Sequence, residues 1–102
     1  MSDGVYIRQG KSATLNITAA QVVASVPKDF AIGQCRLVRV NVLVAGSAAG
    51  AAYDSASLTG NTAANQIGAW PNTVGSYLID MPCLNGIVIA PGAGQTVAVS
   101  YD

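Results

Sequence analysis

The sequence predicts an all-β fold, a single-domain antiparallel β-sandwich or jelly roll of about seven or eight short strands. Apolar residues alternate with a period of two in several short runs, and turn-forming residues separate these runs about every 8–12 residues. No stretch of the 102 residues shows a convincing 3.6-residue apolar repeat, so a helical turn is expected at most at 17–26 or 62–67. One domain over residues 1–102 fits this length, with residues 1–11 as a candidate N-terminal arm.

The clearest strand covers residues 36–44. Its apolar, β-branched face carries Val38, Val40, Val42 and Val44, and its other face carries Leu37, Arg39, Asn41 and Leu43. A period of two with β-branched residues on one side is the strongest strand signal that a sequence offers. The small-residue loop 46–50 follows this strand.

Other strands are expected at 14–18, where Leu15 and Ile17 face inward, and at 76–81, where Pro82 ends the strand. A strand at 21–26 ends before Pro27, because the residue before a proline disfavours helix. The remaining predicted segments are an edge piece at 5–8 and strands at 51–58, 65–70, 86–90 and 96–101.

The last two strands, 86–90 and 96–101, are predicted to form a hairpin. Asn85-Gly86 is a turn dipeptide, and Pro91-Gly92 suits the two central positions of a type II turn. Val97, Val99 and Tyr101 are expected to seal the core. The segment 91–96 is not a phosphate loop, because no lysine follows Lys28 and a strand, rather than a helix, comes next.

The residue inventory argues against an enzyme and against a cofactor. Histidine is absent, which removes Ser-His-Asp and Cys-His machinery and every histidine-based metal site. The five aspartates are scattered singly, and we interpret each as a solvated or turn residue rather than half of a carboxylate pair. Cys35 and Cys83 are too few for an all-cysteine zinc site and are expected to be free thiols in a protein made in a reducing cytoplasm.

Charge and hydropathy favour assembly. Hydrophobic residues make up 51% of the chain and charged residues 10%, and the net charge is zero. Such a surface favours association, although a neutral domain that remains a monomer is the alternative. The polar start predicts no signal peptide, and the absence of a long apolar run predicts no membrane-spanning helix. All five basic residues fall in the first 39 residues, but their charge is too weak for a nucleic-acid-binding surface, which needs clustered lysines and arginines.

Residues 36–101 resemble small virion proteins of tailed bacteriophages. The matching pieces are RLVRVNVLVAGSAAG, then AAYDSAS, then NQIGAWPNTVGSYLIDMPCLNGIVIAPGAGQTVAVSY. In those proteins a strand ending in a small-residue loop precedes a Tyr-Asp step. A proline-centred segment and a hairpin that begins at an Asn-Gly-Ile step follow. Trp70 replaces the usual aliphatic residue before Pro71, and the order and spacing of the pieces carry the resemblance.

The resemblance implies a capsid decoration, or cement, protein. Such proteins are β-sandwich subunits that bind outside the assembled shell, often as trimers or dimers, and clamp neighbouring major capsid protein subunits against internal pressure. A homo-oligomer on the virion surface, made in the host cytoplasm, is therefore expected. The alternative is a head-fibre or tail module that uses exposed aromatic residues to bind host glycans.

The expected capsid-binding role suggests which residues contact the partner. Trp70 is the best aromatic candidate, since it precedes a proline in a turn-like region, although core filling is the expectation for most of the aromatic residues. The N-terminal segment is either an arm that reaches the coat or a sister subunit, or a frayed terminus. The candidate interface residues are Arg8, Lys11, Ser47, Trp70, Pro91, Gly92 and Gln95.

Overall fold

The computed structural model describes residues 12–25 and 35–102. Eight strands form two four-stranded antiparallel sheets, which confirms the predicted all-β sandwich. The strands are β1 (Ser12–Ile17), β2 (Gln21–Ser25), β3 (Cys35–Val44), β4 (Gly50–Tyr53), β5 (Gln66–Trp70), β6 (Gly75–Cys83), β7 (Gly86–Ala90) and β8 (Thr96–Tyr101). The predicted edge piece at 5–8 and the candidate arm at 1–11 lie outside the described residues.

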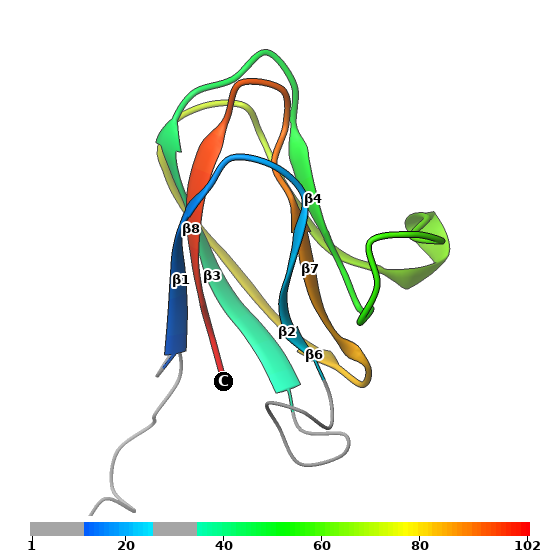
Figure 1. The fold of residues 1–102 in the computed structure, drawn as a ribbon. Helices are drawn as coiled ribbons and strands as arrows, with labels where there is room; N and C mark the ends of the chain where they lie inside the picture. The colour runs from blue at the N-terminus through cyan, green and yellow to red at the C-terminus, as the bar shows by residue number, and fades with distance from the viewer. Residues whose placement is uncertain (1–11, 26–34) are drawn as a thin grey trace, which may run out of the picture.

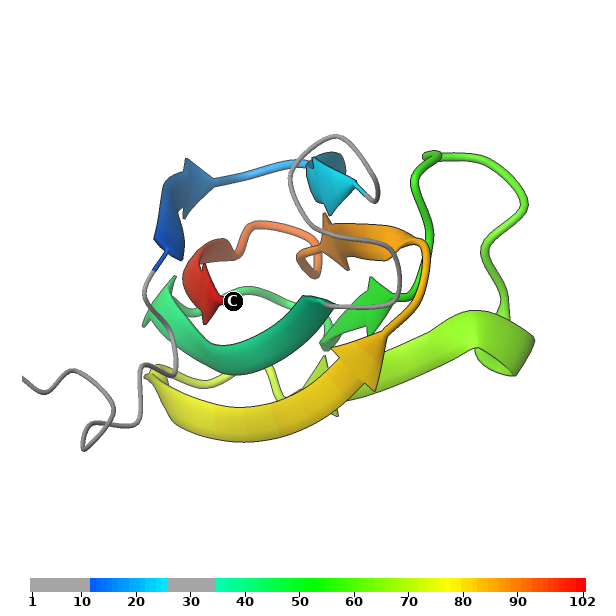
Figure 2. The ribbon, with the colours of Figure 1, turned by 90° about the horizontal axis from the view of Figure 1, so that it is seen from below.

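The strand orders are β1-β8-β3-β6 in one sheet and β2-β7-β4-β5 in the other. These two interleaved orders give the eight-stranded jelly roll. Figure 1 shows β1, β8 and β3 on one side of the sandwich and β2, β7 and β4 on the other, and Figure 2 shows the same two layers from below. The links β1–β2, β3–β4, β5–β6 and β7–β8 gather at the upper end in Figure 1.

The predicted hairpin of the last two strands is wrong, although both strands are present. β7 pairs with β2 and β4, whereas β8 pairs with β1 and β3 in the facing sheet. The link 91–95 therefore crosses from one sheet to the other. Turn residues between two alternating runs report a change of direction, but they do not report which strand becomes the neighbour, and two packed sheets lie only about 10 Å apart.

The core lies between the sheets and contains side chains from both. Val40, Val42, Val97 and Val99 face inward from the first sheet, and Ile87 and Ile89 face them from the second. Every one of these side chains is at most 2% exposed. The alternation predicted for 96–99 and for the middle of β3 is therefore confirmed.

A β-bulge reverses the predicted orientation of Leu15. Thr14 pairs with Val99 and Ile17 pairs with Val97, so residues 15 and 16 of β1 stand opposite a single residue of β8. Asn16 adopts a φ of 58°, which asparagine tolerates better than most residues. Ile17 is fully buried as predicted, but Leu15 is 70% exposed, because the extra residue shifts the alternation by one position.

A second irregularity changes the expected faces of β3. The pairing of β3 shifts between Leu37 and Arg39 on both of its sides. Leu37, which the pattern placed on the polar face, is fully buried, and Val38 is buried as well. Val44, which was placed on the core face, is 51% exposed at the end of the strand, beyond a further register shift.

Two strand ends differ from the prediction. β6 continues through Pro82, which pairs with Arg36, because β6 lies at a sheet edge where a missing N–H group removes no ladder hydrogen bond. The segment predicted as a strand at 51–58 leaves the sheet after Tyr53 and becomes a loop. That loop closes with the short 3-10 helix η2 (Ala63–Asn65), inside 62–67, one of the two segments where the sequence allowed a helical turn.

Candidate functional site

The upper end of the sandwich is tied together by Gln95, which is only 1% exposed. Its Oε1 accepts hydrogen bonds from Trp70 Nε1 at 3.0 Å and from the backbone N–H of Gly92 at 2.9 Å. Its Nε2 donates to the carbonyl oxygen of Pro71 at 2.9 Å. One side chain therefore joins the β7–β8 link to the end of β5 and the beginning of the β5–β6 link.

Backbone contacts bring the β3–β4 link into the same end. The N–H of Gly46 donates to the carbonyl of Asn72 at 3.1 Å, and the N–H of Ser47 donates to the carbonyl of Ala93 at 2.8 Å. A Cβ at position 92 would overlap the carbonyl group of Ala48, so only glycine fits there. Three links thus form one packed unit rather than independent surface loops.

This packing decides what the predicted contact residues can do. Trp70 is 2% exposed, and Gly92 and Gln95 are buried, so these three residues belong to the packed interior and are not accessible to a partner in this conformation. Trp70 looked turn-like because Pro71 follows it, but it is the last residue of β5 and points into the core. Pro91 is half-buried and Ser47 is exposed. Arg8 and Lys11 lie outside the described residues.

The sheet β1-β8-β3-β6 presents an exposed surface that the sequence reasoning missed. On β3, Arg39 stands opposite Leu78 of β6 and opposite Ser100 of β8. Ser100 in turn stands opposite Ala13 of β1. Paired residues share a face, so these four residues form a row across all four strands on the side away from the core. We call this surface the outer leucine face; it consists of Ala13, Leu15, Arg39, Leu43, Leu78 and Ser100.

Three leucines make this face apolar. Leu15, Leu43 and Leu78 are 70%, 55% and 60% exposed, and they come from β1, β3 and β6. Leu43 is exposed beside the buried Val42, at the register shift between β3 and β8. These leucines stand on the same side of one sheet, with the row Ala98, Asn41 and Ser76 between Leu78 and Leu43. Exposed apolar residues gathered on one face are a mark of an interaction site. Its sequence signal was hidden, since the bulge in β1 had to be known before Leu15 could be placed outside.

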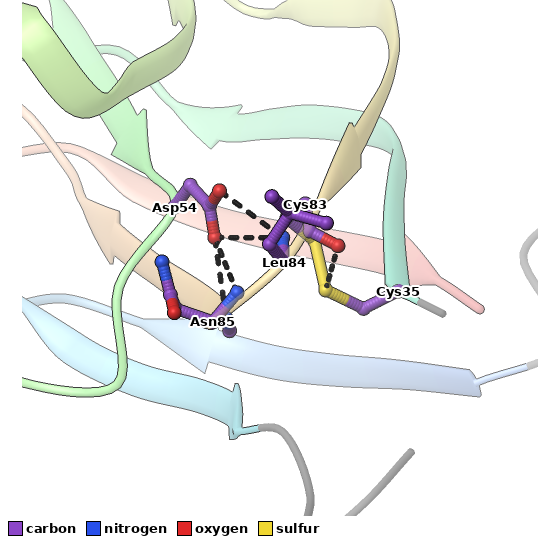
Figure 3. The surroundings of a disulfide bond; sticks show 6 residues. Cys35, Asp54, Cys83, Leu84 and Asn85 are labelled. Carbon is purple, nitrogen blue, oxygen red and sulfur yellow. Dashed lines mark hydrogen bonds between the residues drawn. A yellow bond between two sulfur atoms is a disulfide. The ribbon is translucent and has the colours of Figure 1, made fainter. Parts of the chain in front are cut away.

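The other end of the sandwich contains a disulfide bond between Cys35 and Cys83, which corrects the prediction of two free thiols (Figure 3). The two residues are direct partners in the β3–β6 pairing, and their Cα atoms lie 5.2 Å apart, within the range that a disulfide spans. Both side chains are buried. The 48-residue separation gave no sign of this proximity, which arises only when β3 and β6 pair.

The side chain of Asp54 accepts hydrogen bonds from the β6–β7 turn beside that disulfide (Figure 3). Its Oδ1 accepts the backbone N–H groups of Leu84 at 3.0 Å and of Asn85 at 2.7 Å. Leu84 also donates to Oδ2 at 3.1 Å. The carboxylate therefore connects the end of β4 to a turn that lies 30 residues later in the chain.

We expect Asp54→Ala to lower the free energy of unfolding by about 2–3 kcal/mol, because backbone donors lose a charged acceptor in a partly buried place. Asp54→Asn should cost less, since the amide oxygen still accepts one of these bonds. Chemical denaturation monitored by fluorescence measures both changes. Asp80→Asn is the matched control: Asp80 forms an exposed ion pair with Arg36, so a change below about 1 kcal/mol is expected. Equal losses of unfolding free energy for Asp54→Ala and Asp80→Asn would show that the hydrogen bonds of Asp54 to the turn contribute little.

Within residues 12–25 and 35–102, no ligand-sized pocket opens and no group of three or more His, Cys, Asp or Glu side chains could hold a metal ion. Across the same residues, no helix is both long and apolar enough to cross a bilayer. No protein-family model, no curated protein and no solved structure matches the chain. The outer leucine face is therefore the candidate functional site.

Proposed function

We propose that this chain is a structural virion protein that binds the outside of a bacteriophage capsid and stabilises contacts between major coat subunits. The observation that carries the proposal is the outer leucine face, where Leu15, Leu43 and Leu78 are each more than half exposed. An apolar face on a neutral, weakly charged domain favours burial against another protein. Because residues 36–101 resemble small phage virion proteins, we propose a phage capsid as the surface that this face contacts.

The architecture suits this role. The face lies on a hydrogen-bonded four-stranded sheet, and the links at one end are tied through Gln95, so little ordering is needed on binding. A capsid offers many identical sites, and an oligomer that engages several of them gains affinity without new contacts. A dimer or trimer is therefore part of the proposal. A virion surface is also an oxidising setting, in which the Cys35–Cys83 disulfide persists.

The glycan-binding alternative relied on exposed aromatic residues, and no observation favours it. Trp70 is buried. Tyr53, Tyr77 and Tyr101 are half-buried, and the hydroxyl of Tyr77 donates to the carbonyl of Thr73 at 2.9 Å. We therefore advance the capsid role alone.

Capsid binding tests the proposal directly. Purified virions should contain on the order of hundreds of copies of the chain, because a lattice repeats its sites. Quantitative mass spectrometry of the particles measures this number. A copy number in the tens or below would contradict a decoration role. The purified protein should also sediment with emptied, expanded capsids that lack it.

Replacing two leucines on the outer leucine face should weaken that binding. We expect Leu43→Ser combined with Leu78→Ser to raise the dissociation constant for such capsids by about 100-fold, since burial of each leucine contributes roughly 1.5 kcal/mol or more. Leu58→Ser is the matched control, because Leu58 is 54% exposed but lies in the link between β4 and β5, which belong to the other sheet. Equal binding by the leucine variant and the wild type would remove the face from the docking surface.

A further inference from the structure

We propose that the outer leucine face docks onto a coat-protein surface that presents a carboxylate to Arg39 beside Leu78. This inference rests on the proposed function and names the chemistry of the partner. Arg39 is exposed on β3, and its Nη1 donates to Ser76 Oγ at 3.0 Å. A guanidinium has five N–H donors, so most of its hydrogen-bonding capacity is left for a partner.

The two arginines of β3 differ in their charge partners. Arg36 Nη1 lies 3.0 Å from Asp80 Oδ1, so its charge is compensated within the chain. Arg39 makes no ion pair with any residue of the described ranges 12–25 and 35–102. Within the part of the chain that the structure describes, the positive charge of Arg39 on the outer leucine face therefore has no carboxylate partner. Burying that charge without an anion would oppose docking, whereas a carboxylate on the partner would compensate it.

The surroundings of Arg39 favour a carboxylate over other anions. Leu78 stands opposite Arg39, and Leu43 lies further along β3 on the same side of the sheet. A partner that covers Leu78 also covers the guanidinium opposite it, and a desolvated arginine binds a carboxylate through short, paired, charge-assisted bonds. A nucleic acid would instead need several neighbouring cations to neutralise its phosphates.

A second copy of the chain fits this surface less well. A two-fold contact places the same face on both subunits, so each copy would bring an uncompensated Arg39 into the interface. The acidic residue of β6, Asp80, is already paired with Arg36. Two like charges would then be desolvated together, which opposes association. The observations therefore favour a different protein with a carboxylate.

The test uses the full-length protein and emptied capsids that lack it, with binding measured by co-sedimentation over a range of concentrations. Arg39→Gln should raise the dissociation constant by at least about tenfold, and Arg39→Glu by more, since a hydrogen-bonded charge pair is lost or replaced by repulsion. Arg36→Gln is the matched control and should change binding by less than about twofold, because Asp80 already neutralises that charge. Thermal unfolding of each variant confirms that the fold is retained.

A cross-linking experiment identifies the partner group. In the Arg39→Lys variant, a carbodiimide should join the lysine amine to an aspartate or glutamate of the coat protein as an amide, with the carbodiimide taking up the water that is lost. Peptide mass spectrometry should find residue 39 in that cross-link, and Arg36→Lys should not give it. Absence of the residue-39 cross-link on saturated capsids would overturn the inference.

The remaining outcomes separate this inference from the proposed function. If the leucine variant loses capsid binding but Arg39→Glu binds like the wild type, the carboxylate partner is wrong and the decoration role stands. If the wild type does not bind capsids, both fail. If Arg39→Glu changes the oligomeric state of the free protein, or if Arg39 is needed to bind DNA instead, a second copy or a nucleic acid occupies the face and the inference is overturned.

Discussion

Replacing Gln95 with methionine is expected to lower the free energy of unfolding by about 3–5 kcal/mol, although the two side chains have similar volumes. The methionine would leave the buried donors of Trp70 and Gly92 and the carbonyl of Pro71 without their partner. An unsatisfied buried polar group costs roughly 1–3 kcal/mol, so the losses accumulate at one position. For a domain with marginal stability, this change approaches complete unfolding at physiological temperature.

Two further variants test whether the lost hydrogen bonds of Gln95 cause this loss of stability. Trp70→Phe removes only the indole donor and leaves Gln95 bonded to Gly92 and Pro71, so a smaller loss is expected than for Gln95→Met. Gln66→Met is the matched control, because Gln66 is exposed on β5 and should change stability by less than about 0.5 kcal/mol. Urea denaturation at fixed temperature measures all three. A Gln95 variant as stable as the Gln66 variant would show that the tie across the links contributes little.

Reduction of the Cys35–Cys83 disulfide is the second large expected effect. A cross-link between residues 48 apart restricts the unfolded chain, and the loop-entropy relation gives a stabilisation of about 4 kcal/mol. We expect a reductant to lower the midpoint of thermal unfolding by roughly 15–30 °C for a domain of this size. Scanning calorimetry with and without the reductant measures the shift.

The double variant Cys35→Ala, Cys83→Ala provides the control for that experiment. It should unfold at a lower temperature than the oxidised wild type and should show no response to reductant. Alkylation of the denatured but unreduced wild type should label neither cysteine. Labelling of both would mean that the purified protein carries two free thiols, as the sequence alone suggested.

Local patterns predicted most of the strands. The segments 21–26, 65–70, 86–90 and 96–101 agree with β2, β5, β7 and β8 within one residue at each end. Their period of two and the turn residues that bound them are local properties, so no knowledge of the neighbouring strands is needed. The same local signals failed at Leu15 and Leu37, where a bulge changes which side of the sheet a residue faces.

The candidate site was harder to predict. Three of the contact residues inferred from the sequence are buried in the structure, because the links around them pack against one another. They are Trp70, Gly92 and Gln95. The outer leucine face joins residues from β1, β3, β6 and β8, which are brought together only by strand pairing. A contact surface assembled from four separated strands leaves no local signature.

The sequence by itself determined that this protein is an all-β sandwich with short strands, no histidine chemistry and a neutral, weakly charged surface. These properties depend on composition and on periodicity within single strands. Only the tertiary structure decided that the link 91–95 crosses between sheets, that Cys35 meets Cys83, and that Arg39 stands opposite Leu78 on the outer side of its sheet. Each of these depends on which strands become neighbours and in what register, and register is set by contacts between distant parts of the chain.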